Sequence, residues 1–510
     1  MNVRALSRRG WPHPLAWRQY GLVAVVGVLF LLAAGIRLYN IQKPFVGLLP
    51  VREFRSAIIA RDLYFALNQN APEWAQEVSA LSRAGEWSLE PPLVEGLTAV
   101  TYTVLGSEQL WIPRLYATLF WLLSGLVFWR IGWNLFGGGT AVFLTAYYLF
   151  LPIGVIASKS FQPDSLMMLF YLASLWAILR YDQTPTRRSL LWAMLFSAIA
   201  LFIRPLAIFP IAAAFAALFA YRFTQGERRP LAHLALSGAS LLVGLSYYTY
   251  GLLISDSLAG QAEISFLPHL LRLPYFWQSW LTTGLSAVTL IGLIAALVGL
   301  ALLNSPRLQW LLAGLWGSYF VYGIIFNYHI STHNYYHLQV VPTVALSAGP
   351  LIALLLERAR SLKYSQMRVL WLYGVLALFV LMGLRQVVQN GRQTTVFESP
   401  ALAQEIGQLV NHSTTTVYLS PFYGRPLEYF GQLSGAYWPR PTSFGIYNPD
   451  GAHNSSIAER LSTLNFTPDY FIITHLSEYR NHHADLEAYL TENCELISDN
   501  EQYFVFNNCR

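Results

Sequence analysis

Charged residues are scarce in this chain: Asp, Glu, Lys and Arg make up 12% of its 510 residues, against roughly 25% in soluble globular proteins. Hydrophobic residues make up 55%, and the mean hydropathy is +0.39. Apolar stretches of about 20 residues recur along most of the length, enough for a helix to cross the ~30 Å hydrocarbon layer. The composition excludes an ordinary soluble protein and predicts a multi-pass helical membrane protein.

Cysteine is almost absent, and both cysteines, Cys494 and Cys509, lie near the C-terminus. They can pair if that end is outside the cytoplasm, but two cysteines do not define a redox compartment. No small-residue cleavage site follows the first apolar stretch, residues 20–40, which a basic segment precedes. We therefore interpret this stretch as a retained helix and not as a signal peptide.

The basic residues give a net charge of +6, but they lie mainly between the apolar stretches. This distribution indicates topology control rather than nucleic-acid binding, because cytoplasmic loops collect Lys and Arg. With residues 1–19 as a cytoplasmic N-terminus, nearly every basic cluster falls inside. We expect about eleven spans within a transmembrane domain of residues 20–389: 20–40, 111–129, 139–158, 163–180, 188–204, 205–222, 231–254, 284–303, 310–327, 338–356 and 369–389.

The same topology puts two large segments outside. Residues 41–110 form a long loop, in which the apolar stretch 92–106 is short for a span and carries Glu95, so we expect a helix at the outer interface. Residues 390–510 have the composition of a small soluble α/β domain. Its expected elements are strands at 414–422 and 468–476, helices at 401–410 and 484–492, and a closing hairpin or an edge strand at 497–508.

Four charged or polar clusters lie at the outer ends of these spans, where charge is costly and usually functional. By the predicted topology all four face the same side, which favours a single outer-face site. They are "VREFRSAIIARDLYF" at 51–65, "SKSFQPDS" at 158–165, Arg204 in "FIRPLAIFP", and "HISTHNYYHL" at 329–338.

A simpler interpretation exists for each cluster. The arginines can snorkel to lipid headgroups, and Asp164 after Pro163 can complement the dipole of a helix's first turn. The histidines and tyrosines can form an interfacial aromatic belt. The spacing of His329, His333 and His337 is also compatible with a zinc site, but a loop is expected there and no HExxH motif is present. The joint occurrence of the clusters on one side favours function.

The residue types in these clusters suit one reaction. Lys and Arg at an interfacial cavity suit a lipid phosphate, and a carboxylate facing them can take a proton from an incoming hydroxyl. Transfer of a sugar from a polyprenyl phosphate needs that pair, because positive charge stabilises the departing phosphate. Such a donor needs no nucleotide, and the sequence has no Rossmann fingerprint.

Five motifs follow one another along the chain: "VREFRSAIIAR", "GEWSLEPPL", "SKSFQPDS", "FIRPLAIFP" and "HNYYHLQVVPTVALSAG". In this order and topology they resemble the motifs of the GT-C superfamily of membrane glycosyltransferases. The similar group spans the protein O-mannosyltransferases and the lipid A aminoarabinose transferases, which are like glycosyltransferase family 39. The resemblance covers roughly residues 20–356 and implies a GT-C-type fold.

The resemblance also implies site residues. The family has an acidic pair after the first helix, whose Asp is taken to be the catalytic base; here Arg52 replaces that Asp and leaves Glu53. Glu90 replaces the lysine of the family's "KPP" segment, and Arg204 stands in place of the lysine of its "KGP" junction. The implied roles are catalysis for Glu53 and Asp164, phosphate binding for Arg55, Lys159 and Arg204, and a donor and acceptor pocket for Arg52, Glu90, His333, Tyr336 and His337.

We therefore expect an inverting transferase of the plasma (inner) membrane, with membrane lipids but no nucleic acid as partners. It would move one sugar from a polyprenyl-phosphate donor to a protein, lipid or glycan acceptor on the outer face. A divalent metal on the acidic groups, as in some GT-C enzymes, stays open, although the first loop has no DxD pair. Two alternatives stay open as well: a transporter or flippase of lipid-linked substrates, with ionisable residues at mid-membrane, and an inactive relative that kept the groove.

Overall fold

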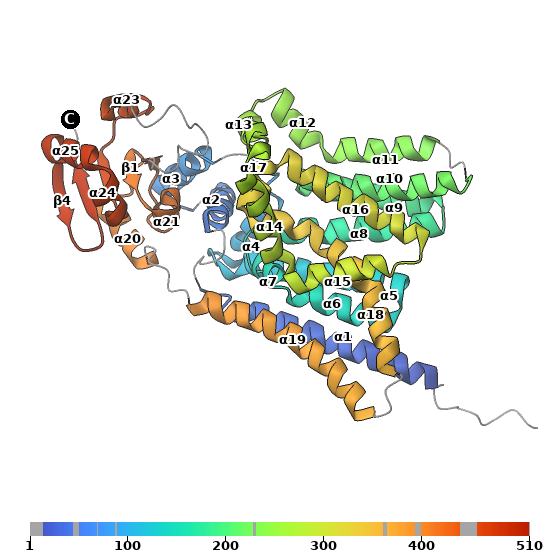
Figure 1. Cartoon of the computed structure of the whole chain (residues 1–510). Helices are drawn as coiled ribbons and strands as arrows, with labels where there is room; N and C mark the ends of the chain where they lie inside the picture. Colours follow the sequence, from blue (N-terminus) through green and yellow to red (C-terminus); the bar gives the residue numbers. More distant parts are fainter. Residues whose placement is uncertain are drawn as a thin grey trace, which may run out of the picture.

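The computed structural model describes residues 14–43, 50–68, 70–86, 89–227, 231–360, 365–392, 399–438 and 456–508. Figure 1 shows a helical bundle at one end and a small sheet with its own helices at the other. Helices α2 (Pro50–Leu67), α3 (Glu73–Ala84) and α4 (Leu93–Leu105) lie between them. The predicted fold class, a polytopic helical protein with a small α/β part near the C-terminus, is confirmed.

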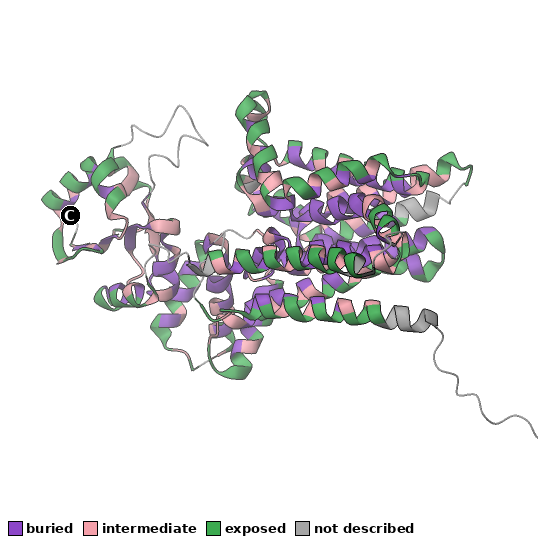
Figure 2. Ribbon diagram, turned by 60° about the horizontal axis from the view of Figure 1, so that its bottom comes forward, coloured by how far each residue is buried: buried purple, intermediate pink, exposed green. Residues whose placement is uncertain are grey.

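Six helices of the described residues are long and apolar enough to cross a membrane: Gly21–Leu38, Trp111–Phe136, Pro205–Thr224, Pro306–Ile325, Asn334–Ala359 and Leu370–Gln389. A pair of helices bent by 90°, Pro274–Val288 and Leu290–Ala301, can form a seventh span. Buried residues gather in the middle of the bundle, whereas helices at its edge are largely exposed (Figure 2). The exposed side chains include large apolar ones such as Leu31 and Leu370, as contact with lipid requires. The chain is a multi-pass membrane protein.

The predicted number of eleven spans is not confirmed. The expected span 139–158 divides into α6 (Gly138–Phe150) and α7 (Pro152–Ala157), because Pro152 has no amide hydrogen to continue the helix. The expected span 231–254 also divides, into two helices that end and begin on either side of Leu245. Apolar runs predict length, but they do not reveal such breaks.

The bundle also contains longer and shorter helices on either side of these breaks. They are α1 (Pro14–Leu38), α5 (Trp111–Phe136), α8 (Asp164–Gln183), α9 (Arg187–Ile203), η1 (Pro205–Ala207), α10 (Ile208–Thr224), α11 (Leu231–Gly244), α12 (Ser246–Leu253), α13 (Ala259–Glu263), η2 (Pro268–Arg272), α14 (Pro274–Val288), α15 (Leu290–Ala301), α16 (Pro306–Ile325), α17 (Asn327–Thr332), η3 (Asn334–Val340), α18 (Val341–Arg360) and α19 (Ser365–Arg392).

A five-stranded sheet with the order β2-β1-β3-β5-β4 forms the centre of the C-terminal part. Strands β2, β1 and β3 are parallel, and β5 and β4 form the antiparallel hairpin expected from the sequence. Cys494 is disulfide-bonded; the other cysteine, Cys509, lies outside the described residues. The elements are α20 (Pro400–Leu409), β1 (Thr416–Leu419), η4 (Pro421–Gly424), α21 (Arg425–Phe430), β2 (Gly435–Tyr437), α23 (Ile457–Ser462), β3 (Tyr470–Ile473), α24 (Leu476–His482), α25 (Ala484–Asn493), β4 (Glu495–Asp499) and β5 (Phe504–Asn507).

Helix α2 connects this C-terminal part to the bundle. Its Phe54 packs edge-on against Phe430 of α21, with the ring centroids 5.6 Å apart. Phe161, from the turn before α8, belongs to the same buried cluster. One helix therefore contacts both the end of the bundle and the α/β part, and the charged stretch 51–65 lies on it.

Candidate functional site

Glu90 is the centre of a buried cluster of charged side chains. Its carboxylate lies 2.5 Å from Nη2 of Arg52, 3.6 Å from Nη1 of Arg55 and 3.8 Å from Nε of Arg204. Arg52 and Arg55 are three residues apart on α2, so they share one face of the helix. Glu90 itself is 8% exposed, so the three arginines, and not water, stabilise its negative charge.

Asp164 completes this group, which we call the arginine cluster: Arg52, Arg55, Glu90, Asp164 and Arg204. Asp164 opens α8, and Arg204 lies in extended backbone between α9 and η1. The Nη1 atom of Arg204 donates a hydrogen bond to Asp164, and both residues are buried. The cluster therefore joins α2, the segment before α4, and the neighbouring ends of α8 and α9.

The arginines control the protonation of Glu90. Burial alone would raise the pKa of its carboxyl, but Arg52, Arg204 and Arg55 outweigh burial and lower the pKa to about 2. For Arg52, burial alone would lower the pKa, but Glu90 and the nearby tyrosines raise it well above its ordinary value. Glu90 is therefore ionised at neutral pH, and Arg52 stays protonated beside it.

Two tyrosines cover the arginine cluster on one side. The guanidinium carbon of Arg204 is 5.4 Å from the ring centroids of both Tyr335 and Tyr336, and that of Arg52 is 5.8 Å from the ring of Tyr335. These distances are typical of cation–π contacts. His329 stacks on Tyr336 with the centroids 4.9 Å apart, so the aromatic motif "HISTHNYYHL" supplies one wall of the site.

The histidines of this wall are neutral. Burial, together with Arg52, lowers the pKa of His333 to about 4, and burial together with His333 and Arg52 lowers that of His329 to about 3. His337 is placed differently: it is completely buried, and its ring contacts the Tyr319 hydroxyl at 2.7 Å and the Ile330 carbonyl at 3.0 Å. The structure therefore brings His333 close to Arg52 but turns the ring of His337 into the bundle.

Glu53 lies in a second group beside the arginine cluster. It is 1% exposed, and its Oε1 accepts a hydrogen bond of 3.1 Å from the backbone amide of Phe161. The charge of Glu53 acts on Lys159. Burial, together with Arg114, lowers the pKa of Lys159 to about 8, and Glu53 opposes this change. The Lys159 ammonium donates to the Tyr39 carbonyl at 2.7 Å. Lys159 therefore lies with Glu53, apart from the ion pairs of Arg52 and Arg204.

Glu95 is a residue of this region that the sequence analysis did not assign to the site. It is 3% exposed on α4, its Oε1 accepts from the Ser56 hydroxyl at 2.7 Å, and burial raises its pKa. The sequence carries a signal for this residue, because an ionisable residue in a short apolar helix is a candidate for function.

The acidic residues of the arginine cluster do not suit a divalent metal. Glu90 and Asp164 are both engaged by arginines, whereas Mg²⁺ and Ca²⁺ need oxygen ligands without competing cations. Within the described ranges, no three His, Cys, Asp or Glu side chains are placed to share a metal ion. The residues of the arginine cluster therefore do not fit a divalent metal.

Residues 89–250 match the model of a family described as dolichyl-phosphate-mannose-protein mannosyltransferase. The whole chain shares its fold with ArnT from Cupriavidus metallidurans in the apo state, with 15% identity, a TM-score of 0.59, and coverage of 97% of this chain and 98% of ArnT. The ArnT structure bound to undecaprenyl phosphate has 16% identity, a TM-score of 0.57 and the same coverage of 97% and 98%.

A second similar structure is the oligosaccharyltransferase AglB from Archaeoglobus fulgidus, in complex with an inhibitory peptide and a dolichol-phosphate. It is 11% identical, with a TM-score of 0.52, and the alignment covers 96% of this chain and 74% of AglB. No curated protein sequence matches the chain. The resemblance to GT-C glycosyltransferases predicted from the sequence is confirmed at the level of the fold.

Proposed function

Starting from the GT-C fold, we propose that this protein transfers a sugar from a polyprenyl-phosphate-linked donor to an acceptor on the outer face of the membrane. Two proteins of similar fold hold a polyprenyl phosphate: undecaprenyl phosphate in ArnT and a dolichol-phosphate in AglB. The segment that matches the mannosyltransferase family, residues 89–250, contains Glu90, Asp164 and Arg204 of the arginine cluster. Both likenesses support a lipid-linked donor.

The gathering of three arginines in the arginine cluster carries this proposal. Arg52, Arg55 and Arg204 all lie around Glu90 at the end of the bundle, with little exposure to water. The planar guanidinium group matches the oxygens of a phosphate and binds them through charged hydrogen bonds, so the cluster suits a lipid phosphate. The cluster therefore favours an anionic ligand at the end of the bundle that borders α2 and the α/β part.

In the proposed reaction the acceptor oxygen attacks the anomeric carbon of the sugar, and its proton passes to Glu53. The bond from that carbon to the phosphate oxygen breaks, and the phosphate leaves with the bonding electrons. Arg55 and Arg204 stabilise the charge that develops on the phosphate, and Lys159 adds positive charge beside Glu53. A single displacement of this kind inverts the anomeric carbon. Asp164 orients Arg204 and the acceptor.

The pocket around these groups is proposed to hold both substrates. Arg52 and Glu90 form its charged floor, and Tyr336 with His333 forms its aromatic wall. His337 supports this wall from behind, through its contact with the Ile330 carbonyl. The acceptor is a protein, lipid or glycan that carries a nucleophilic group.

The test is a transfer assay on purified protein with a radiolabelled polyprenyl-phosphate sugar. We expect Glu53→Gln to lower the rate by about 10²–10⁴-fold, the usual contribution of a general base, and Asp164→Asn to lower it as well. The matched control is Asp62→Asn, which removes a carboxylate from the same helix at an ion pair with Arg83 that is partly exposed. Unchanged transfer in both site variants would refute the assignment of these residues.

The same assay separates the two alternatives. A transporter or flippase would move the labelled lipid without breaking its sugar–phosphate bond, and an inactive relative would bind the lipid without transfer or hydrolysis. One observation supports the alternative of an inactive relative: Arg52 occupies the position of the family's Asp. Transfer or hydrolysis by the wild-type protein excludes both.

A further inference from the structure

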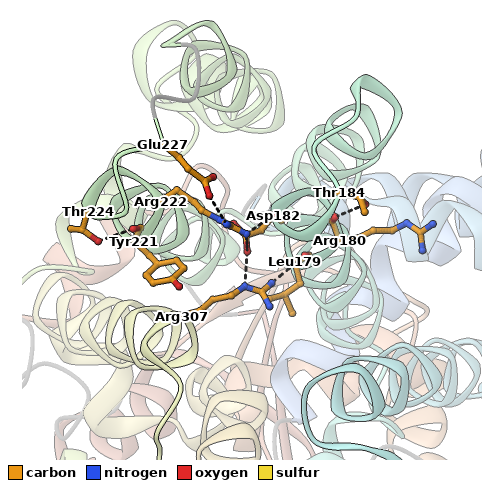
Figure 3. A network of polar contacts seen from close by, with 9 residues as sticks. All are labelled: Leu179, Arg180, Asp182, Thr184, Tyr221, Arg222, Thr224, Glu227 and Arg307. Carbon is orange, nitrogen blue, oxygen red and sulfur yellow. Dashed lines mark hydrogen bonds and ion pairs between the residues drawn. The ribbon is translucent and has the colours of Figure 1, made fainter.

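A second network of charged residues lies at the far end of the bundle from the arginine cluster. Asp182, which is 2% exposed near the end of α8, accepts from Nε of Arg222 at 2.9 Å and from Nε of Arg307 at 2.5 Å (Figure 3). Asp164, at the start of α8, is 18 residues away, which is about 27 Å along a helix. This network ties together the ends of α8, α10 and α16.

A cavity of about 290 Å³ opens beside this network. Its volume is just below the range of about 300–1,000 Å³ that is typical of small-molecule sites. Most of its lining is apolar, with a few polar groups among the leucines. The lining residues are Asn134, Leu135, Phe136, Leu179, Leu218, Leu302, Leu303, Asn304, Ser305, Arg307, Leu308, Leu311 and Pro350.

Arg307 belongs to both the network and the cavity lining. Its Nε holds Asp182, and its Nη2 donates to the Leu179 carbonyl at 3.3 Å. In the described part of the chain its hydrogen bonds and ion pairs use these two nitrogens, so Nη1 is left for a ligand. Its side chain is 23% exposed. The first turn of α16, which begins at Pro306, adds the partial positive charge of a helix N-terminus.

The charges around the cavity favour an anion. Arg307 is the one charged side chain among the lining residues, and no Asp or Glu of the described part of the chain lines the cavity. In the network of Figure 3, Asp182 pairs with Arg222 and Arg307, and Arg222 also pairs with Glu227. The burial of Asp182 between two arginines holds Arg307 in a fixed position at the cavity. A preorganised guanidinium group above an apolar cavity matches a molecule with an anionic head and an apolar chain.

We propose that this cavity binds a phosphate-bearing membrane lipid. The phosphate contacts Nη1 of Arg307 and the first turn of α16, and part of the lipid's apolar chain lies among Leu179, Leu218 and Leu311. This site is separate from the proposed donor site, because it lies at the other end of α8. The proposed contacts use only the phosphate and the apolar chain, so a phospholipid without a sugar suits the site.

The test is native mass spectrometry of the purified full-length protein, delipidated in a non-ionic detergent and titrated with phosphatidylglycerol. We expect saturable binding, weakened about tenfold in Arg307→Gln by the loss of one charged hydrogen bond. Leu302→Trp, which fills the cavity from its partly exposed wall, should weaken it as well. The matched control is Arg180→Gln, which removes the same charge at the same end without touching the lining.

Three outcomes would overturn the proposal. Equal weakening in Arg180→Gln and Arg307→Gln would mean diffuse attraction of anionic lipid. Competition by millimolar inorganic phosphate would mean a free-phosphate site rather than a lipid site. Unchanged binding in Leu302→Trp together with Arg307→Gln would mean that the lipid lies elsewhere on the bundle.

Discussion

At the scale of single residues, Glu90 determines how the site is charged. It is the shared partner of Arg52, Arg55 and Arg204, and buried cations are costly without a carboxylate to pair with. The sequence placed Glu90 in the pocket only as a departure from a family lysine. Its central position among the arginines came from the structure.

We predict that Glu90→Gln destabilises the protein by about 3–5 kcal/mol, the usual cost of leaving buried charges without a partner. The measurement is the free energy of unfolding in a detergent titration. The control is again Asp62→Asn, whose partner Arg83 is 36% exposed, so that it should cost less than about 1 kcal/mol. Equal losses in the two variants would show that Glu90 is not the counter-charge of the cluster.

At the scale of elements, α2 links the site to the C-terminal part through Arg61. The Arg61 guanidinium lies 3.9 Å from the ring centroid of Tyr429 and its Nε donates to Glu108 at 2.9 Å. The Tyr429 hydroxyl donates to the same carboxylate at 3.0 Å. The other face of α2 carries Arg52 and Arg55. A shift of α21 would therefore displace these arginines through α2.

We predict that Tyr429→Phe costs about 1 kcal/mol, because it loses one hydrogen bond, and that Tyr429→Ala costs about 3–5 kcal/mol, because it also removes a buried ring. Both losses should appear as faster amide hydrogen exchange in α2 and α21. Tyr423→Ala serves as the control, since Tyr423 is 50% exposed. Equal rates of hydrogen exchange in Tyr423→Ala and Tyr429→Ala would contradict this coupling.

We expect the contact between the loop after α3 and α21 to depend on pH through Glu86. Burial raises the pKa of Glu86 from 4.5 to about 7, although Arg425, 2.7 Å away, opposes the change. The folded protein thus binds this proton more tightly than the unfolded chain does. Its contribution to stability is complete below about pH 4.5 and is lost as the pH rises through about 7.

We therefore predict that hydrogen exchange in α21 (Arg425–Phe430) becomes faster as the pH rises from about 4.5 to about 7, after correction for the intrinsic exchange rate. Glu86→Gln stays neutral and should remove this dependence. An unaltered pH profile in Glu86→Gln would assign the effect to another group.

At the scale of the whole molecule, we predict that residues 1–19 and the basic loops face the cytoplasm and that the C-terminal part faces outward, as the distribution of Lys and Arg indicates. Cysteines introduced at Gln225 and Glu501, both exposed, test this. A membrane-impermeant maleimide should label Glu501→Cys in intact cells, and Gln225→Cys only after the membrane is opened. The reverse pattern would invert the topology and the proposed side of the reaction.

Much of the architecture could be predicted from the sequence, because apolar length and alternation are local properties. The first span, the strands β1 and β3 and the closing hairpin all lie where the pattern predicts them. The breaks beside Pro152 and Leu245 could not be read from apolar runs, since a run of side chains says little about where the backbone bends. For this reason the predicted count of eleven spans is not confirmed.

The sequence by itself determined that the chain is a membrane protein and that its charges collect in a few clusters, because both follow from composition and order along the chain. Only the tertiary structure decided which charges meet. Arg204 pairs with Asp164 from 40 positions away, and Arg52 with Glu90 from 38. Such pairs depend on how α2, α8 and α9 pack, and packing depends on contacts that no local pattern contains.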